Sequence, residues 1–323
     1  MAVKNFEQVK RKLQECYAHE DYQGAFELAL KYSDQFPEHK HVLYYWLSTM
    51  AARSGNKEQA LSALKEMLDA GFWYGEALLQ HNPSYQDLLE EPEFKQLVLE
   101  NRILQELEQD QVHHLLTIRG EDKCLSEENP CPLLLGLHAN ESTAQQSLIY
   151  WRRAAAEGWL VAVPQSSQAM WKGAYVWNNL EVSSWEIQGY LQSLKTQYAI
   201  DPEKTIVAGH AMGGELAAWL VLTGRISARG FIAFNPSGPF MDDPGSWLPI
   251  IEHASGSGLK GYIILEESDF STPHSNIWNF VNALNAADIP CELEIILSFD
   301  REFLDEYENS LARALNYVAS DLF

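Results

Sequence analysis

Basic residues are scarce in this chain of 323 residues. It holds 23 Lys and Arg against 45 Asp and Glu, which gives a formal net charge of −22 at pH 7. Nucleic acids and anionic membrane surfaces attract clustered positive charge, so this balance argues against both as partners. We interpret the acidity as a property that favours solubility.

Long apolar runs are missing and cysteines are few. No stretch approaches the ~18 uninterrupted apolar residues of a membrane span, and the opening residues, Met-Ala-Val-Lys-Asn-Phe-Glu, contain no apolar segment of a secretory signal. The cysteines form no C-x-x-C pair and no histidine pair completes a zinc pattern; they are Cys16, Cys124, Cys131 and Cys291. We expect a cytoplasmic protein with reduced thiols, no metal and no cofactor.

Glycine and proline are also sparse in residues 1–110, which we predict to form an all-α domain. Residues 21–30 and 56–64 are similar, and Ala25 and Ala60 lie 35 residues apart. This spacing is close to the ~34-residue period of tetratricopeptide repeats, which these segments resemble. The resemblance implies a groove for a partner peptide. The alternative is a helical cap that shapes or covers the second domain.

From about residue 111, short apolar runs alternate with helical segments. Continuous apolar runs indicate strands buried on both faces, and their alternation with helices indicates a mostly parallel α/β sheet. The predicted strands are residues 114–118, 132–137, 160–163, 205–208, 230–234, 261–265 and 292–297; the predicted helices are residues 144–157, 181–198, 214–223, 276–287 and 302–319. Ligands bind at the C-terminal ends of such strands, so the loops that follow them are the candidate site.

The most specific pattern is the stretch 205–218, Thr-Ile-Val-Ala-Gly-His-Ala-Met-Gly-Gly-Glu-Leu-Ala-Ala. A strand, a tight glycine turn and a helix in this order form the nucleophile elbow, G-x-S-x-G. The central position carries Ala211, which has no oxygen to attack with and no proton to give up. The backbone N–H of Met212 and the helix dipole remain available to an anion or a carbonyl oxygen.

The strand end at His138-Ala139-Asn140, taken with this elbow, resembles the α/β-hydrolase superfamily, most closely its carboxylesterase and phospholipase-like branch. The resemblance implies a His-Gly pair here, followed by a backbone N–H that supplies half of an oxyanion hole. Ala139 stands in place of the glycine, and Asn140 carries the candidate N–H. His138 is either part of this site or a buried, hydrogen-bonded histidine at a strand end.

The same resemblance assigns the remaining positions. The aromatic loop with Trp171, Tyr175 and Trp177 matches sequence that lines the substrate pocket; the alternative is that it packs against the helical domain. Asp269 occupies the slot of the triad acid. The slot of the triad histidine holds Arg301, and no histidine follows residue 274.

Nucleophile and base are therefore both missing. One lost triad member is enough to inactivate such an enzyme, so two losses favour natural loss of catalysis over an engineered substrate trap. Arginine never acts as a base in proteins, but it pairs with carboxylates. We hypothesise that Arg301 forms an ion pair with Asp269.

The sequence thus predicts an α/β-hydrolase domain over residues 111–323, preceded by a tetratricopeptide-like domain over residues 1–110. We expect a cytoplasmic pseudo-hydrolase that binds a small acyl- or ester-like ligand, or a protein partner, without turnover. Two alternatives stay open. One is a serine carboxylesterase or lipase-like hydrolase present in an inactive form, and the other is a scaffold that works through its helical repeats.

Overall fold

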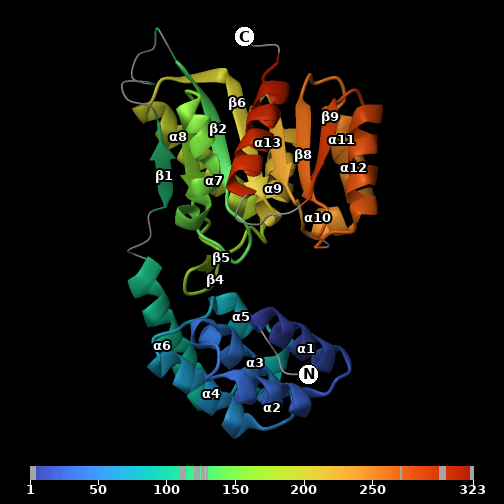
Figure 1. Cartoon of the computed structure of the whole chain (residues 1–323). Helices are drawn as coiled ribbons and strands as arrows, with labels where there is room; N and C mark the ends of the chain where they lie inside the picture. Colours follow the sequence, from blue (N-terminus) through green and yellow to red (C-terminus); the bar gives the residue numbers. More distant parts are fainter. Residues whose placement is uncertain are drawn as a thin grey trace. The chain divides into compact units, whose positions relative to one another are not determined.

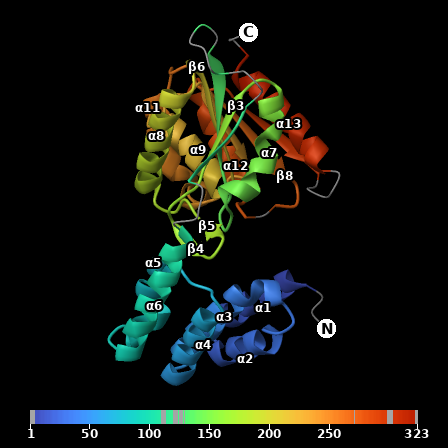
Figure 2. The same ribbon diagram turned by 90° about the vertical axis from the view of Figure 1, so that its left-hand side faces the viewer.

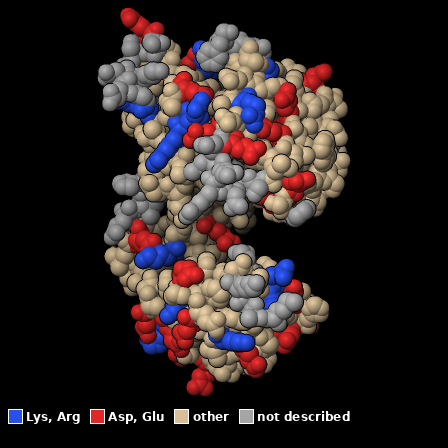
Figure 3. All heavy atoms as spheres, viewed as in Figure 1, with Lys and Arg blue, Asp and Glu red and all other residues tan. Residues whose placement is uncertain are grey.

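The computed structural model describes residues 5–109, 114–119, 124, 128, 130–269, 271–297 and 303–320. The chain divides into two compact units, Met1–Val112 with Ala169–Lys172, and His113–Gln168 with Gly173–Phe323 (Figure 1). No described helix combines the length and the hydropathy that crossing a lipid bilayer requires. On the face shown in Figure 3, the described Lys and Arg side chains lie among carboxylates.

The first unit is built from helices. Asn5, Asp21 and Asn56 each cap a helix by accepting a backbone N–H three residues further on. Ala25 and Ala60 are fully buried where neighbouring helices pack. The elements are α1 (Phe6–Ala18), α2 (Tyr22–Tyr32), η1 (Pro37–His39), α3 (Lys40–Arg53), α4 (Lys57–Asp69), α5 (Glu76–Gln80), η2 (Pro83–Leu88) and α6 (Pro92–Gln109). The tetratricopeptide likeness of these residues stays a prediction.

The second unit contains a seven-stranded sheet of order β1-β3-β2-β6-β7-β8-β9. β1 pairs with β3 antiparallel, and all other neighbours are parallel. The strands are β1 (Leu115–Ile118), β2 (Cys131–Leu137), β3 (Leu160–Pro164), β6 (Ile200–His210), β7 (Gly230–Phe234), β8 (Lys260–Glu266) and β9 (Cys291–Ile296). The predicted mixed α/β class with a mostly parallel sheet is confirmed.

Helices cover both faces of this sheet (Figures 1 and 2). One face packs against α7 (Ala144–Ala156) and α13 (Phe303–Val318). The other packs against α8 (Leu180–Gln197), α9 (Met212–Leu222), α11 (Leu248–Ala254) and α12 (His274–Ala286). Successive strand side chains point to opposite faces: Leu134 packs on the first side, and Leu133 and Leu135 on the second. Strands buried on both sides need unbroken apolar runs, as the sequence has.

Several short elements were not predicted. The long connection after β3 contains β4 (Ala169–Trp171) and β5 (Ala174–Tyr175), and α10 (Pro239–Asp242) and η3 (Pro244–Trp247) follow β7. Ala169–Lys172 groups with the helical unit, where Trp171 forms a β-bridge with Tyr74. Elements of two to four residues leave no hydrophobic period in a sequence.

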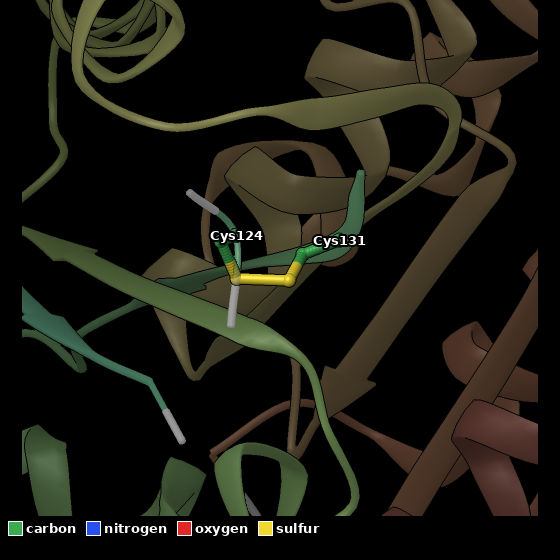
Figure 4. Close-up of a disulfide and its surroundings, with 2 residues drawn as sticks. All are labelled: Cys124 and Cys131. Carbon is green, nitrogen blue, oxygen red and sulfur yellow. A yellow bond between two sulfur atoms is a disulfide. The ribbon is translucent and has the colours of Figure 1, made fainter. Parts of the chain in front are cut away.

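The expectation of four reduced thiols was wrong. Cys124 and Cys131 form a disulfide, shown in Figure 4. Their Cα atoms lie 5.1 Å apart although seven positions separate them in the sequence. The backbone N–H of Cys131 and the carbonyl of Cys124 both hydrogen-bond Ala199, which brings the two residues together. Tertiary folding, and not a short cysteine motif, creates this pair. Cys16 and Cys291 remain free.

Candidate functional site

The turn between β6 and α9 holds Ala211 in a backbone conformation that L-residues rarely adopt. Its φ is 48° and its ψ is −120°. Such a conformation costs of the order of 1–3 kcal/mol and persists only when the surroundings enforce it. The N–H of Ala211 donates to the carbonyl of Phe234, and its carbonyl accepts from the N–H groups of Gly214, Glu215 and Ser237. The peptide bonds of the elbow are therefore held on both sides.

The glycines around this turn leave no room for a side chain. A Cβ on Gly209 would lie 2.1 Å from the carbonyl oxygen of Gly213. A Cβ on Gly213 would lie 2.4 Å from the carbonyl oxygen of His138. The helix that follows the elbow consequently approaches the end of β2 at backbone distance. The strand–turn–helix geometry predicted from the glycines is present, with a methyl group at its apex.

A cavity of about 380 Å³ opens over this apex, a size within the ~300–1,000 Å³ range of small-molecule sites. Its wall comes from the C-terminal ends of the neighbouring strands β2, β6, β7 and β8, and from α7. The lining residues, which we call the elbow pocket, are Ala139, Ser142, Ser147, Tyr150, His210, Ala211, Phe234, Asn235 and Asp269. Three of these residues, Ala139, Ala211 and Asp269, were predicted from the elbow and loop patterns of the sequence. The residues of α7, Ser147 and Tyr150, were not, because helix periodicity does not tell which side chain faces a cavity.

The backbone N–H groups near the elbow that have no acceptor among the described residues include two that the sequence singled out. One belongs to Met212, the first residue of α9, and the other to Asn140. Ala139, between His138 and Asn140, lines the elbow pocket. Because Gly213 closely approaches His138, the start of α9 lies beside the loop that follows β2. Unused N–H donors at a helix start favour an oxygen that carries negative charge.

Asp269 lines the elbow pocket, as its slot in the triad predicts. Its carboxylate Oδ1 accepts from the N–H of Ser271 at 2.7 Å. His274 Nε2 lies 2.7 Å from the backbone oxygen of Asp269, a contact with the main chain and not with the carboxylate. Arg301 lies outside the described residues, so its ion pair with Asp269 stays a hypothesis.

Comparison with known structures bears on the fold. The structure of an uncharacterized protein from Bacillus cereus ATCC 10987 is similar over 98% of this chain and 100% of its own, with 21% identity and a TM-score of 0.53. A sugar hydrolase (YeeB) from Lactococcus lactis is similar over 64% of this chain and 94% of its own, with 16% identity and a TM-score of 0.50. The second unit has the α/β-hydrolase fold. Identities this low establish the fold alone.

The helical unit has a match of its own. Residues 5–108 match the family model described as A/B hydrolase-like, N-terminal domain. No curated protein sequence matches the chain. This match does not address the likeness of these residues to tetratricopeptide repeats, which stays a prediction.

His210 is the described histidine that faces the elbow pocket of the α/β-hydrolase unit. Its ring stacks on Trp151 with centroids 5.0 Å apart and contacts Tyr150, Phe234 and Tyr307 edge-on. Burial among these rings lowers the pKa of His210 to about 3. No carboxylate of the described chain hydrogen-bonds it, so His210 is a weak base without an orienting acid. Its ring forms part of the apolar lining of the elbow pocket.

His138 does not line the elbow pocket. Its side chain is fully buried, its Nδ1 lies 2.7 Å from the Ala139 carbonyl, and its Nε2 accepts from the N–H of Ser166. Burial lowers the pKa of His138 to about 4, so the neutral ring with Nδ1–H fits both bonds. Trp177 packs on this ring at 4.7 Å and donates from Nε1 to the His138 carbonyl. These contacts match the second of the two roles considered for His138, a buried, hydrogen-bonded histidine at a strand end.

The aromatic loop divides between the two units. Trp171 lies in the helical unit, 5.5 Å from the ring of His41, and does not line the elbow pocket. Tyr175 and Trp177 are buried in the α/β-hydrolase unit, and the N–H of Tyr175 donates to the Ser142 carbonyl. Tyr175 and Trp177 therefore support the loop after β2 through hydrogen bonds to its backbone, while Ser142 in that loop lines the elbow pocket.

Glu215 is a buried carboxyl group that sequence reasoning did not single out. It lies in the first turn of α9, 2% exposed, and its Oε2 accepts from the N–H of Met241 at 2.7 Å. Burial raises the pKa of Glu215 to about 7, against the opposing effect of the hydrogen bonds from Met241 and Phe240. Glu215 thus ties the elbow helix to the loop after β7. An acidic residue after two glycines gives no sign of such burial.

Proposed function

We propose that this protein binds a small acyl- or ester-like ligand in the elbow pocket and does not turn it over. The observation that carries the proposal is Ala211, a residue without a nucleophile on a turn that is still held in the strained shape of the elbow. The strained conformation lowers stability, and Ala211 has no hydroxyl that could use it for catalysis. We therefore assign to this turn the role of shaping the elbow pocket.

Binding rests on the groups that surround this methyl group. We assign the N–H groups of Met212 and Asn140, which have no acceptor among the described residues, as donors to the carbonyl oxygen of the ligand; Met212 lies at the positive end of the α9 dipole. The rings of Tyr150, His210 and Phe234 supply apolar wall for an acyl chain. Asp269 also lines the cavity, and its carboxylate disfavours a ligand that carries negative charge.

Turnover of 4-nitrophenyl butanoate tests the proposal. We expect only slow hydrolysis by the protein as it stands, since backbone donors alone give roughly 10³–10⁴-fold acceleration over water. Ala211→Ser should stay slow, because Arg301 supplies no base. Ala211→Ser combined with Arg301→His should be the fastest of the three. Fast hydrolysis by Ala211→Ser alone would refute the proposal and favour an enzyme present in an inactive form.

Ligand binding needs its own measurement. Butanoyl anilide is a slowly hydrolysed amide analogue, and its affinity can be measured by isothermal titration calorimetry. Ala211→Trp fills the elbow pocket and should abolish binding, whereas Ala286→Trp, at an exposed position of α12, should not. Equal binding by wild type and both variants would show that the elbow pocket is not the site.

A further inference from the structure

The helical unit contains a second cavity, independent of the elbow pocket. Its volume is about 390 Å³. It lies between the end of α1, the middle of α3, α5 and the connection from α5 to η2. The rings of Tyr17 and Trp46 meet edge to face at 6.1 Å in its wall. The lining residues, which we call the helical pocket, are Tyr17, Tyr45, Trp46, Thr49, Met50, Leu78, His81, Asn82 and Ser84.

Three hydroxyl groups of the helical pocket already accept a hydrogen bond from a group that can only donate. Tyr45 Oη accepts from Asn82 Nδ2 at 2.7 Å, and Asn82 is fixed in this orientation because its Oδ1 accepts from the N–H of Ser84. Ser84 Oγ accepts from Arg53 Nε at 3.0 Å, and Tyr17 Oη accepts from Arg53 Nη2 at 3.4 Å.

The protons of these hydroxyls have no acceptor among the described residues. A hydroxyl has one proton and two lone pairs, so each of the lining residues Tyr17, Tyr45 and Ser84 keeps a proton that it can donate to a ligand. Burial raises the pKa of Tyr45, which keeps its hydroxyl protonated. Three hydroxyl donors in the lining suit a ligand group that only accepts.

Arg53 does not line the helical pocket itself, but it lies behind two lining residues, Ser84 and Tyr17, to which its guanidinium donates. Its guanidinium lies 5.9 Å from the ring of Tyr17 and 5.8 Å from that of Tyr22. No carboxylate of the described chain forms an ion pair with it, although the sequence carries 45 acidic residues. A cation held by rings and hydroxyls, in a protein with excess carboxylates, is complementary to an external anion.

We propose that the helical pocket binds a small aromatic carboxylate. The aromatic ring packs against Tyr17, Trp46 and Met50, and the carboxylate accepts from the lining hydroxyls. Arg53, which donates to two of these hydroxyls, supplies the compensating positive charge. The volume fits a single small molecule. This site is separate from the elbow pocket, so it stands or falls independently of the function proposed there.

The test uses the full chain and 3-phenylpropanoate as the probe, with isothermal titration calorimetry. We expect a Kd below about 1 mM, and at least roughly tenfold weaker binding of 3-phenylpropanamide, which has the same shape without the charge. Butanoate, which lacks the ring, should also bind at least roughly tenfold more weakly, because it loses the aromatic contact.

Matched variants locate the site. Arg53→Met should weaken binding of 3-phenylpropanoate about tenfold or more, whereas Arg11→Met, at an exposed position of α1, should not change it. Tyr45→Phe removes one donor with little change of shape and should weaken binding several-fold; Tyr44→Phe, its neighbour outside the lining, should not. Ala211→Trp should bind like wild type, since it fills only the elbow pocket.

Three results would overturn the proposal. The first is no binding of 3-phenylpropanoate at about 5 mM. The second is equal affinity for the acid and the amide. The third is wild-type affinity in both Arg53→Met and Tyr45→Phe with far-UV circular dichroism unchanged. If Arg53→Met alters the dichroism, Tyr45→Phe decides.

Discussion

The buried carboxyl of Glu215 should make the stability of the α/β-hydrolase unit fall as the pH rises. Its pKa is raised from 4.5 to about 7 by burial. In the unfolded chain the group ionises near pH 4.5, whereas in the folded chain it keeps its proton up to about pH 7. The favourable contribution is therefore complete below pH 4.5 and is lost as the pH rises through 7. A difference of this size corresponds to about 3 kcal/mol, as an order of magnitude.

The perturbation that isolates this group is Glu215→Gln. Glutamine does not titrate, and its amide oxygen can still accept from the N–H of Met241, which now meets the Glu215 Oε2 at 2.7 Å. Relative to wild type, the variant should gain up to about 3 kcal/mol in the free energy of unfolding between pH 5 and pH 8. Other carboxylates titrate in both proteins, so they cancel in the difference. Glu252→Gln, at an exposed helix position, is the control and should show no such gain.

Two measurements check this prediction. Native-state hydrogen exchange of α9 amides reports the local free energy of opening at each pH, and does not require both units to unfold together. Carbon-13 NMR of labelled glutamate carboxyls gives the pKa directly, with Glu215 assigned as the signal that Glu215→Gln removes. A titration midpoint near 4.5 for that signal would refute the reasoning, because burial would then not be penalising the charged form.

Two further predictions follow from backbone geometry and from the cysteines. Gly213→Ala should destabilise the α/β-hydrolase unit by about 1–3 kcal/mol, because the new Cβ would lie 2.4 Å from a carbonyl oxygen. Gly189→Ala is the control: the same substitution in a helix meets open space there and should stabilise the unit by up to about 1 kcal/mol. Thermal unfolding compares the two variants. In denaturant without reductant, thiol titration should find only Cys16 and Cys291 reactive, since Cys124 and Cys131 are paired. Four reactive thiols in freshly purified protein would show that the pair is reduced there.

The strand pattern of the second unit was predictable because each strand is buried on both faces. Residues 160–163, for example, form a short run of apolar side chains that has to leave water on both sides of the sheet, and β3 is found there. The elbow was predictable for a related reason: Gly209 and Gly213 are needed where backbones approach within contact distance. These features depend on local composition, which a single sequence displays.

Features that depend on distant partners were not predictable. The environment of Glu215 is set by Met241, 26 residues further along the chain, and the disulfide depends on Ala199, far from both cysteines. The sequence left two roles open for His138, and the choice between them is made by Trp177 and Ser166 from another loop. Such contacts leave no mark in periodicity or spacing.

The grouping of Ala169–Lys172 with the helical unit bears on how the protein can be divided for experiments. A truncation near residue 112 would remove Tyr74, whose backbone pairs with that of Trp171, and would leave a tryptophan that is 8% exposed in the intact protein without its cover. Separate expression of residues 113–323 should therefore yield an aggregation-prone product unless the β4–β5 segment is shortened or Trp171 is replaced by a polar residue.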